Sequence, residues 1–174
     1  MRKVALVFAG GFCGALARYL LATPLLALAV HLAPAAPQGF PFDILFINLT
    51  GALSLGLLYG LFERGAAISP EARLFIGTGF LGAYTTFSTY IYGADRLLTD
   101  GAALVGWLYL LGSLALGVGC ARLGYVSAGV LLARRRLLRR GRTALRRVGR
   151  VYWRDTGVPG CLLYTSPSPR DRQK

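Results

Sequence analysis

The sequence predicts an all-α membrane protein with four transmembrane helices. Of its 174 residues, 55% are hydrophobic and only 16% are charged, and the mean hydropathy is +0.52. Soluble domains usually carry about 25% charged residues. A bilayer crossing needs about 20 mostly apolar residues. Four stretches meet this requirement: residues 4–30, 40–62, 72–98 and 102–133.

The first stretch, residues 4–30, is interpreted as a true span. It is too long, and too lightly basic at its start, for a cleaved signal peptide. Arg18 lies well inside it, after three glycines in GGFCGALARYL. A buried guanidinium costs several kcal/mol unless it reaches water, a carbonyl or an anion. Two interpretations stay open: Arg18 extends to the membrane surface, or it lines a positive vestibule that attracts anions.

The second stretch, residues 40–62, contains Asn48 within FINLTG. A buried amide needs a hydrogen-bond partner, and taken alone such a residue is most often a link between helices. Gly51 shares the helical face of Asn48 and allows close backbone approach. Close helix contacts are also predicted by pairs of small residues four positions apart: Gly10/Gly14, Gly56/Gly60 and Ser113/Gly117.

The third stretch, residues 72–98, is predicted to be a helix broken near the middle of the membrane. It contains GTGFLGAYTTFSTY (residues 77–90), in which three glycines are followed by four hydroxyl residues. Non-helical backbone at this depth survives only where it is buried in protein or lines a wet cavity. Broken helices commonly present backbone groups to ions. The pattern therefore predicts an ion site inside the membrane.

Two aromatic residues, Phe87 and Tyr90, follow the expected break and share a helical face. The edge of an aromatic ring is positive and its face is negative. Ring edges can therefore line a path for an anion without binding it tightly. Taken alone, however, two such aromatics are more often part of a packed core.

No Asp or Glu lies deep in any of the four stretches. Proton-coupled transporters and intramembrane hydrolases normally need a titratable group there, so both classes are disfavoured and an enzyme is not expected. The remaining polar groups are neutral hydrogen-bond donors, which suit an anion. The single histidine, His31, and the widely separated cysteines give no support for a zinc or redox site.

The charge distribution predicts how the chain inserts. Residues 1–133 carry a net charge of only +2, whereas residues 134–174 carry +11. Around the spans, Arg2, Lys3, Arg64 and Arg73 fall on the side of the basic tail, and only Arg96 falls on the other. The positive-inside rule then places both ends of the chain in the cytoplasm.

Composition divides the chain into three regions. Residues 1–133 form the transmembrane domain. Residues 134–155 form a basic juxtamembrane tail, which we expect to lie on anionic membrane lipid; nucleic-acid binding is the less favoured alternative. Residues 156–174 are rich in Ser and Pro, and we expect them to be disordered or not native to the protein.

In this order, GGFCGALARYL, FINLTG and TGFLGAYTTFSTY resemble the Fluc/CrcB family of fluoride ion channels. The resemblance covers about residues 4 to 130. It implies an antiparallel, dual-topology dimer with two fluoride pores in the plasma membrane (the bacterial inner membrane), through which cytoplasmic fluoride leaves passively. The residues that it implies for the fluoride pathway are Asn48, Phe87, Tyr90, Ser88, Thr89, Tyr109 and, at the vestibule, Arg18.

The resemblance also implies a structural sodium ion (Na+) at the dimer axis, held by the backbone carbonyls of Gly82 and Thr85 of each chain. Two features depart from the family pattern. Tyr90 stands where the family more usually has Phe. The strong Lys/Arg bias is unusual for a chain that inserts in both orientations. The partner is therefore either a second copy, in a homodimer, or an oppositely oriented homologue, in a heterodimer.

The main alternative is a small four-helix drug or cation exporter of the dual-topology kind. Such an exporter requires a carboxylate within the membrane, usually in the first span, and this chain has Arg18 there. A second alternative is a membrane scaffold that transports nothing. That alternative leaves the polar residues in the third stretch unexplained.

Overall fold

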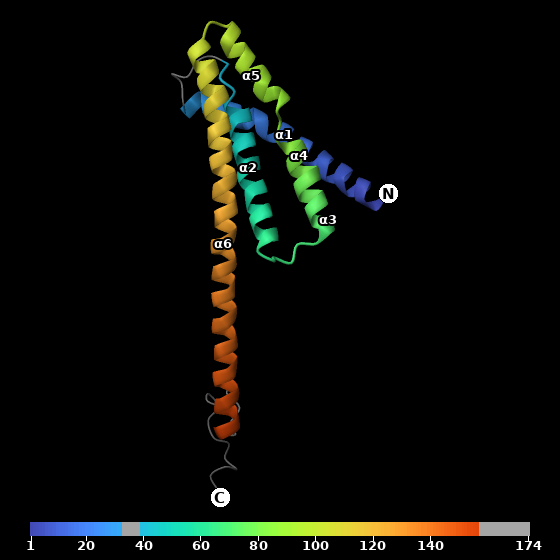
Figure 1. The fold of residues 1–174 in the computed structure, drawn as a ribbon, viewed down its shortest axis with the longest axis vertical. Coiled ribbons are helices and arrows are strands. Elements are labelled where there is room, and N and C mark those ends of the chain that lie inside the picture. The colour runs from blue at the N-terminus through green and yellow to red at the C-terminus, as the bar shows by residue number, and fades with distance from the viewer. Residues whose placement is uncertain (33–38, 157–174) are drawn as a thin grey trace, which may run out of the picture. The chain divides into compact units, whose positions relative to one another are not determined.

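A computed structural model describes residues 1–32 and 39–156 of the protein, and all regular structure in these ranges is helical (Figure 1). The chain forms two compact units, Met1–Leu132 and Ala133–Lys174. The elements, in order, are α1 (Arg2–Leu32), α2 (Phe42–Glu63), α3 (Pro70–Arg73), the π-helix η1 (Leu74–Leu81), α4 (Gly82–Tyr84), α5 (Ser88–Thr99) and α6 (Ala103–Thr156).

Three helices are long and apolar enough to cross a membrane, and these segments are Arg2–Leu28, Phe42–Glu63 and Ala103–Arg134. They coincide with the first, second and fourth predicted stretches, so the prediction of an all-helical membrane protein is confirmed. The third predicted stretch is not one continuous helix. Helical residues run from Pro70 to Tyr84, residues 85–87 are not helical, and α5 begins at Ser88.

Local chemistry explains where the middle elements begin and end. Gly65, just after α2, has a positive φ of 75°, a conformation that favours glycine. Ser69 caps α3, because its Oγ accepts a hydrogen bond from the Ala72 N–H at 3.1 Å. Pro70 occupies the first turn of α3, where its missing N–H costs nothing.

Glycines allow two pairs of helices to touch at their backbones. A Cβ atom placed on Gly10 or Gly14 of α1 would overlap the carbonyl oxygen of Phe75 or Phe80. A Cβ on Gly56 of α2 would likewise overlap the Ala121 carbonyl of α6, and α2 lies alongside α6 in Figure 1. The predictions for these two small-residue pairs are therefore confirmed.

The third small-residue pair behaves differently. A Cβ on Gly117 would have no neighbour within 4 Å among the described residues. The predicted close contact is therefore wrong at Gly117 within the single chain, whereas the Oγ of Ser113, one turn earlier on the same face of α6, is buried.

The first unit has a small core beside a large exposed apolar surface. Ala94, Leu97 and Tyr109 form a buried cluster that joins α5 to α6. In contrast, many large apolar side chains of the long helices are exposed, such as Phe8 of α1 and Leu104 of α6. An apolar surface of this extent is typical of a membrane or protein interface.

The second unit contains the basic tail. Helix α6 extends through residues 134–155 to Thr156. The side chains after Arg134 and all residues after Thr156 lie outside the described part. The predicted lipid contact of the tail and the predicted disorder of its end therefore stay predictions.

Candidate functional site

The side chain of Asn48 links α2 to the non-helical residues 85–87. Its Nδ2 donates to the Thr86 carbonyl at 2.9 Å, and its Oδ1 accepts from the Thr86 N–H at 2.9 Å. One amide side chain therefore satisfies both backbone polar groups of Thr86. Because Thr85 is extended, with φ −77° and ψ 156°, the backbone at this point needs a partner from another helix.

These contacts leave two backbone carbonyls without their usual helical donors. In a continuous helix, the N–H groups of Thr86 and Thr89 would donate to the carbonyls of Gly82 and Thr85. Here the Thr86 N–H donates to Asn48, and the Thr89 N–H donates to the Thr86 Oγ1 at 3.3 Å. The two carbonyl oxygens predicted to hold sodium are thus available for another ligand.

The chemistry of these two carbonyls suits a sodium ion. Unwound backbone carbonyls are the groups that coordinate Na+ in broken membrane helices. A Cβ placed on Gly82 would meet no described atom within 4 Å, so the backbone here is open on one side. Among the described residues, no group of three or more His, Cys, Asp or Glu side chains offers a different metal site.

Three hydroxyl side chains gather where α5 begins. The Thr86 Oγ1 donates to the Thr89 Oγ1 at 3.1 Å and lies 3.4 Å from the Ser88 Oγ. Ser88 and Thr89 are exposed. Because the N-terminal end of a helix carries a partial positive charge, this group combines neutral donors with a potential that favours an anion.

Four aromatic rings form a row beside these hydroxyls. Phe87 lies 5.9 Å from Tyr90, Tyr90 lies 5.4 Å from Tyr109, and Tyr109 lies 5.5 Å from Phe40, measured between ring centroids. Phe87 is 75% exposed, whereas Tyr109 is only 3% exposed. The row therefore leads from the surface of the single chain into its core, and it includes three of the predicted pathway residues.

Two buried hydroxyls on α6 have no hydrogen-bond partner in the described part of the chain. They are the Tyr109 Oη and the Ser113 Oγ. The two residues are four positions apart and share one helical face. A buried hydroxyl without a partner costs about 1–3 kcal/mol, so this face is a place where a ligand that accepts hydrogen bonds would be stabilised.

Arg18 is half-buried on α1. In residues 1–32 and 39–134 it makes no described ion pair or side-chain hydrogen bond, and no described contact joins it to Asn48 or to the aromatic row. Arg64 and Arg73 differ, since their guanidinium groups lie over the rings of Tyr125 and Phe62 at 4.2 and 4.3 Å.

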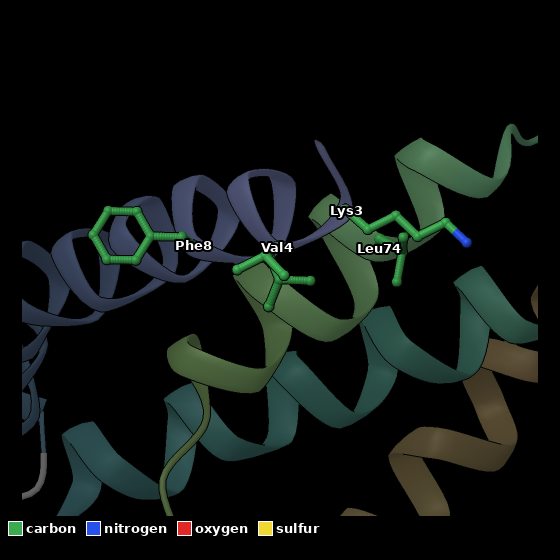
Figure 2. A pocket seen from close by; sticks show the side chains of 5 residues that line it. Lys3, Val4, Phe8 and Leu74 are labelled. Carbon is green, nitrogen blue, oxygen red and sulfur yellow. The ribbon is translucent and has the colours of Figure 1, made fainter. Parts of the chain in front are cut away.

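Two described cavities lie away from the predicted pathway. The larger has a volume of about 430 Å³ and is shown in Figure 2 between the start of α1 and η1. The smaller, of about 200 Å³, lies between α2 and η1. Neither is lined by any predicted pathway residue.

Sequence reasoning missed two residues of this region. It did not identify Phe40, whose ring meets Tyr109 edge-on at 81°, and it named Ser113 only as one of a pair of small residues at a helix contact. Both depend on which helices pack together, and no local pattern around either residue carries that information.

The chain matches the family model described as "CrcB-like protein, Camphor Resistance (CrcB)" over residues 5–125. It is 45% identical over 134 residues to a protein of Chlorobaculum tepidum named fluoride-specific ion channel FluC, covering 77% of this chain and 96% of that protein. A protein of the same name from Pyrococcus furiosus is 38% identical over 128 residues, covering 74% of this chain and 97% of the relative. The chain therefore belongs to the CrcB family.

Proposed function

We propose that this protein is a fluoride-selective ion channel, not an enzyme, that lets cytoplasmic fluoride leave the cell passively across the plasma membrane. The names of its relatives support this function. The observation that carries it is the group of neutral hydrogen-bond donors around residues 85–87, held in place by Asn48. Fluoride is small and tightly hydrated, so a pore must replace its water with donors at several weak sites.

The donors follow one another along the proposed pathway. Asn48 uses one amide N–H for Thr86 and has a second that is free to reach an anion. Ser88 and Thr89 add hydroxyls, and the edges of Phe87 and Tyr90 add weakly positive ring hydrogens. The unpartnered hydroxyls of Tyr109 and Ser113 continue the series, and Arg18 attracts anions to a vestibule. None of these groups brings a negative charge.

Residues 70–99 are proposed to cross the membrane as a fourth, interrupted segment, with α3, η1 and α4 on one side of the break and α5 on the other. Two chains then associate in antiparallel orientation. The 75% exposure of Phe87 supports this assembly, because a pathway residue that is open in one chain is covered when a second chain packs against it.

A structural sodium ion is proposed at the carbonyls of Gly82 and Thr85. The support is that both oxygens have lost their helical donors, since the N–H groups of Thr86 and Thr89 bond elsewhere. When bound, the ion supplies positive charge that offsets the cost of holding anions nearby in a low-dielectric region.

Replacing Asn48 by Asp tests this function most sharply. In Asn48→Asp, an oxygen replaces the Nδ2 donor opposite the Thr86 carbonyl, and a negative charge enters the pathway. We expect fluoride efflux from liposomes that contain the purified variant to fall by about a hundredfold or more, because an unpaired buried charge costs several kcal/mol.

The matched control is Ser54→Ala on the same helix. Ser54 is exposed, and its variant is expected to keep wild-type flux. Fluoride flux of Asn48→Asp equal to that of the wild type would contradict the proposal. Transport of a drug that depends on a proton gradient, with no fluoride flux, would instead identify an exporter.

A further inference from the structure

A hollow of about 200 Å³ lies between α2 and η1, beside the loop that connects α2 to α3 (Figure 1). Among the described residues that line it, Arg73 alone is charged and none is Asp or Glu. Thr78 of η1 adds a hydroxyl group, whereas Leu55 and Leu58 of α2 are apolar. The hollow is therefore amphipathic, and its single charge is positive.

The guanidinium of Arg73 is held against two aromatic rings. Its Cζ lies 4.3 Å from the ring centroid of Phe62 and 5.8 Å from that of Tyr59. Rings attract a cation placed over them, and this contact leaves the five N–H donors at the edge of the guanidinium plane available. Within residues 1–32 and 39–134, Arg73 makes no described side-chain hydrogen bond or ion pair. Two adjacent N–H groups can therefore bind two oxygens of a phosphate at once.

The same two rings indicate that this group lies near the membrane surface. Tyr59 and Phe62 belong to the last two turns of α2 and are 51% and 41% exposed, and aromatic side chains are enriched where membrane meets water. Arg73 falls on the side that the charge distribution predicts to face the cytoplasm, where anionic lipids attract basic groups. Leu55, one turn before Tyr59, lies closer to the middle of the membrane. The charged and apolar parts of the hollow thus follow the order of the headgroup and acyl chains of a lipid.

We propose that this hollow binds one anionic phospholipid, whose phosphate accepts hydrogen bonds from Arg73 and whose first acyl carbons lie against Leu55 and Leu58. Pockets that enclose a drug-sized ligand have volumes of about 300–1,000 Å³. A volume of about 200 Å³ therefore admits only part of a lipid, and the rest of the molecule stays in the bilayer. This inference goes beyond the proposed fluoride channel and does not depend on it.

The test measures lipid binding to the purified protein in an uncharged detergent. The unfolding temperature is followed while phosphatidylglycerol, phosphatidylcholine or inorganic phosphate is added, and native mass spectrometry counts the lipids bound in the same samples. The wild type is compared with Arg73→Gln, Arg73→Lys and Arg2→Gln. Arg2 is the matched control, because it is exposed, lies on the same predicted side of the membrane and does not line the hollow.

For the wild type we expect phosphatidylglycerol to raise the unfolding temperature until the effect saturates, because a ligand of the folded state stabilises it. Arg73→Gln should need about tenfold more phosphatidylglycerol for half of this effect, the size expected when a hydrogen bond to a charged group is lost. Arg73→Lys should fall between the two, since it keeps the charge but loses the planar pair of donors. Arg2→Gln should match the wild type, and all four proteins should unfold at similar temperatures without lipid.

Four outcomes would overturn the lipid site. Equal effects of phosphatidylglycerol and phosphatidylcholine would remove the need for an anionic headgroup, and an equal effect of inorganic phosphate would make this a site for a free anion. An equal loss of binding in Arg2→Gln and Arg73→Gln would indicate general surface charge. A smaller assembly of Arg73→Gln in size-exclusion chromatography, with lipid binding unchanged, would assign the hollow to a second chain. None of these measurements involves transport, so the fluoride-channel function stands or falls separately.

Discussion

At the scale of single residues, the site depends on how α2 holds residues 85–87. Asn48 binds both backbone groups of Thr86, and Gly51 leaves room for the preceding residue, Thr85. A Cβ on Gly51 would overlap the Cγ2 of Thr85 and lie 3.4 Å from the Cδ1 of Tyr84. The side chain of Asn48 and the missing side chain of Gly51 therefore act together on the same three-residue segment.

Replacing Gly51 by Ala should disturb this segment. The added methyl group would push Thr85 away from α2, and overpacking of this kind costs about 1–3 kcal/mol. We expect fluoride flux from liposomes to fall about tenfold. Gly119→Ala on α6 is the control, because its Cβ meets no described atom within 4 Å. Wild-type flux in Gly51→Ala would show that the site does not need close packing at Thr85.

The sequence identified several of these residues but not their partners. Asn48 and Gly51 are recognisable because a polar residue and a glycine share one face of an apolar helix. Their contacts with residues 85–87 link distant parts of the sequence. Asn48 and its partner Thr86, for example, are 38 residues apart. The hydrogen bond that the Tyr90 hydroxyl donates to the Leu110 carbonyl likewise depends on how α5 packs on α6, which local periodicity does not encode.

At the scale of elements, the interruption between α4 and α5 has a local chemical cause. The three glycines, Gly77, Gly79 and Gly82, stay helical. Gly79 instead permits contact with α1, since its Cβ would come within 2.9 Å of Gly10. The non-helical residues begin at the threonines, whose hydroxyls compete for backbone groups. Within the stretch that the sequence singled out, the residues that are not helical therefore begin at the threonines and not at the glycines.

Removal of sodium should test the role of the carbonyls freed at this interruption. A ligand that binds only the folded state stabilises it according to its concentration. We expect the unfolding temperature of the purified protein to rise with sodium concentration, and fluoride flux to fall when N-methyl-D-glucamine replaces sodium. Potassium at equal ionic strength is the control. Identical unfolding temperature and flux in all three cations would contradict a sodium site.

At the scale of the whole molecule, the exposed surface indicates what surrounds the chain. Large apolar side chains of α1 and α6, such as Phe8 and Leu104, are exposed, and Phe87 of the proposed pathway is exposed with them. Composition predicted the helices and their apolar character, since both follow from stretches of suitable length. Composition could not predict which exposed side chains meet lipid and which meet a second chain, because both surfaces are apolar.

Cysteine labelling should reveal the orientation of the chain. A single cysteine is introduced by Ala67→Cys, at an exposed position after α2, in a variant whose native cysteines are replaced. An antiparallel homodimer places this thiol on both faces of the membrane, so an impermeant maleimide should label about half of the molecules from each side. The asymmetry of Lys and Arg around the spans, taken alone, favours a single orientation of the chain. Labelling from one side only would contradict the homodimer and indicate an oppositely oriented partner chain.

The most direct test of the central claim is the anion current of the purified chain, alone in a lipid bilayer, with fluoride on one side and chloride on the other and no proton gradient. If neutral donors around residues 85–87 replace the hydration shell of fluoride, the current should be carried by fluoride and not by chloride. A bilayer that passes both halides equally would contradict the account.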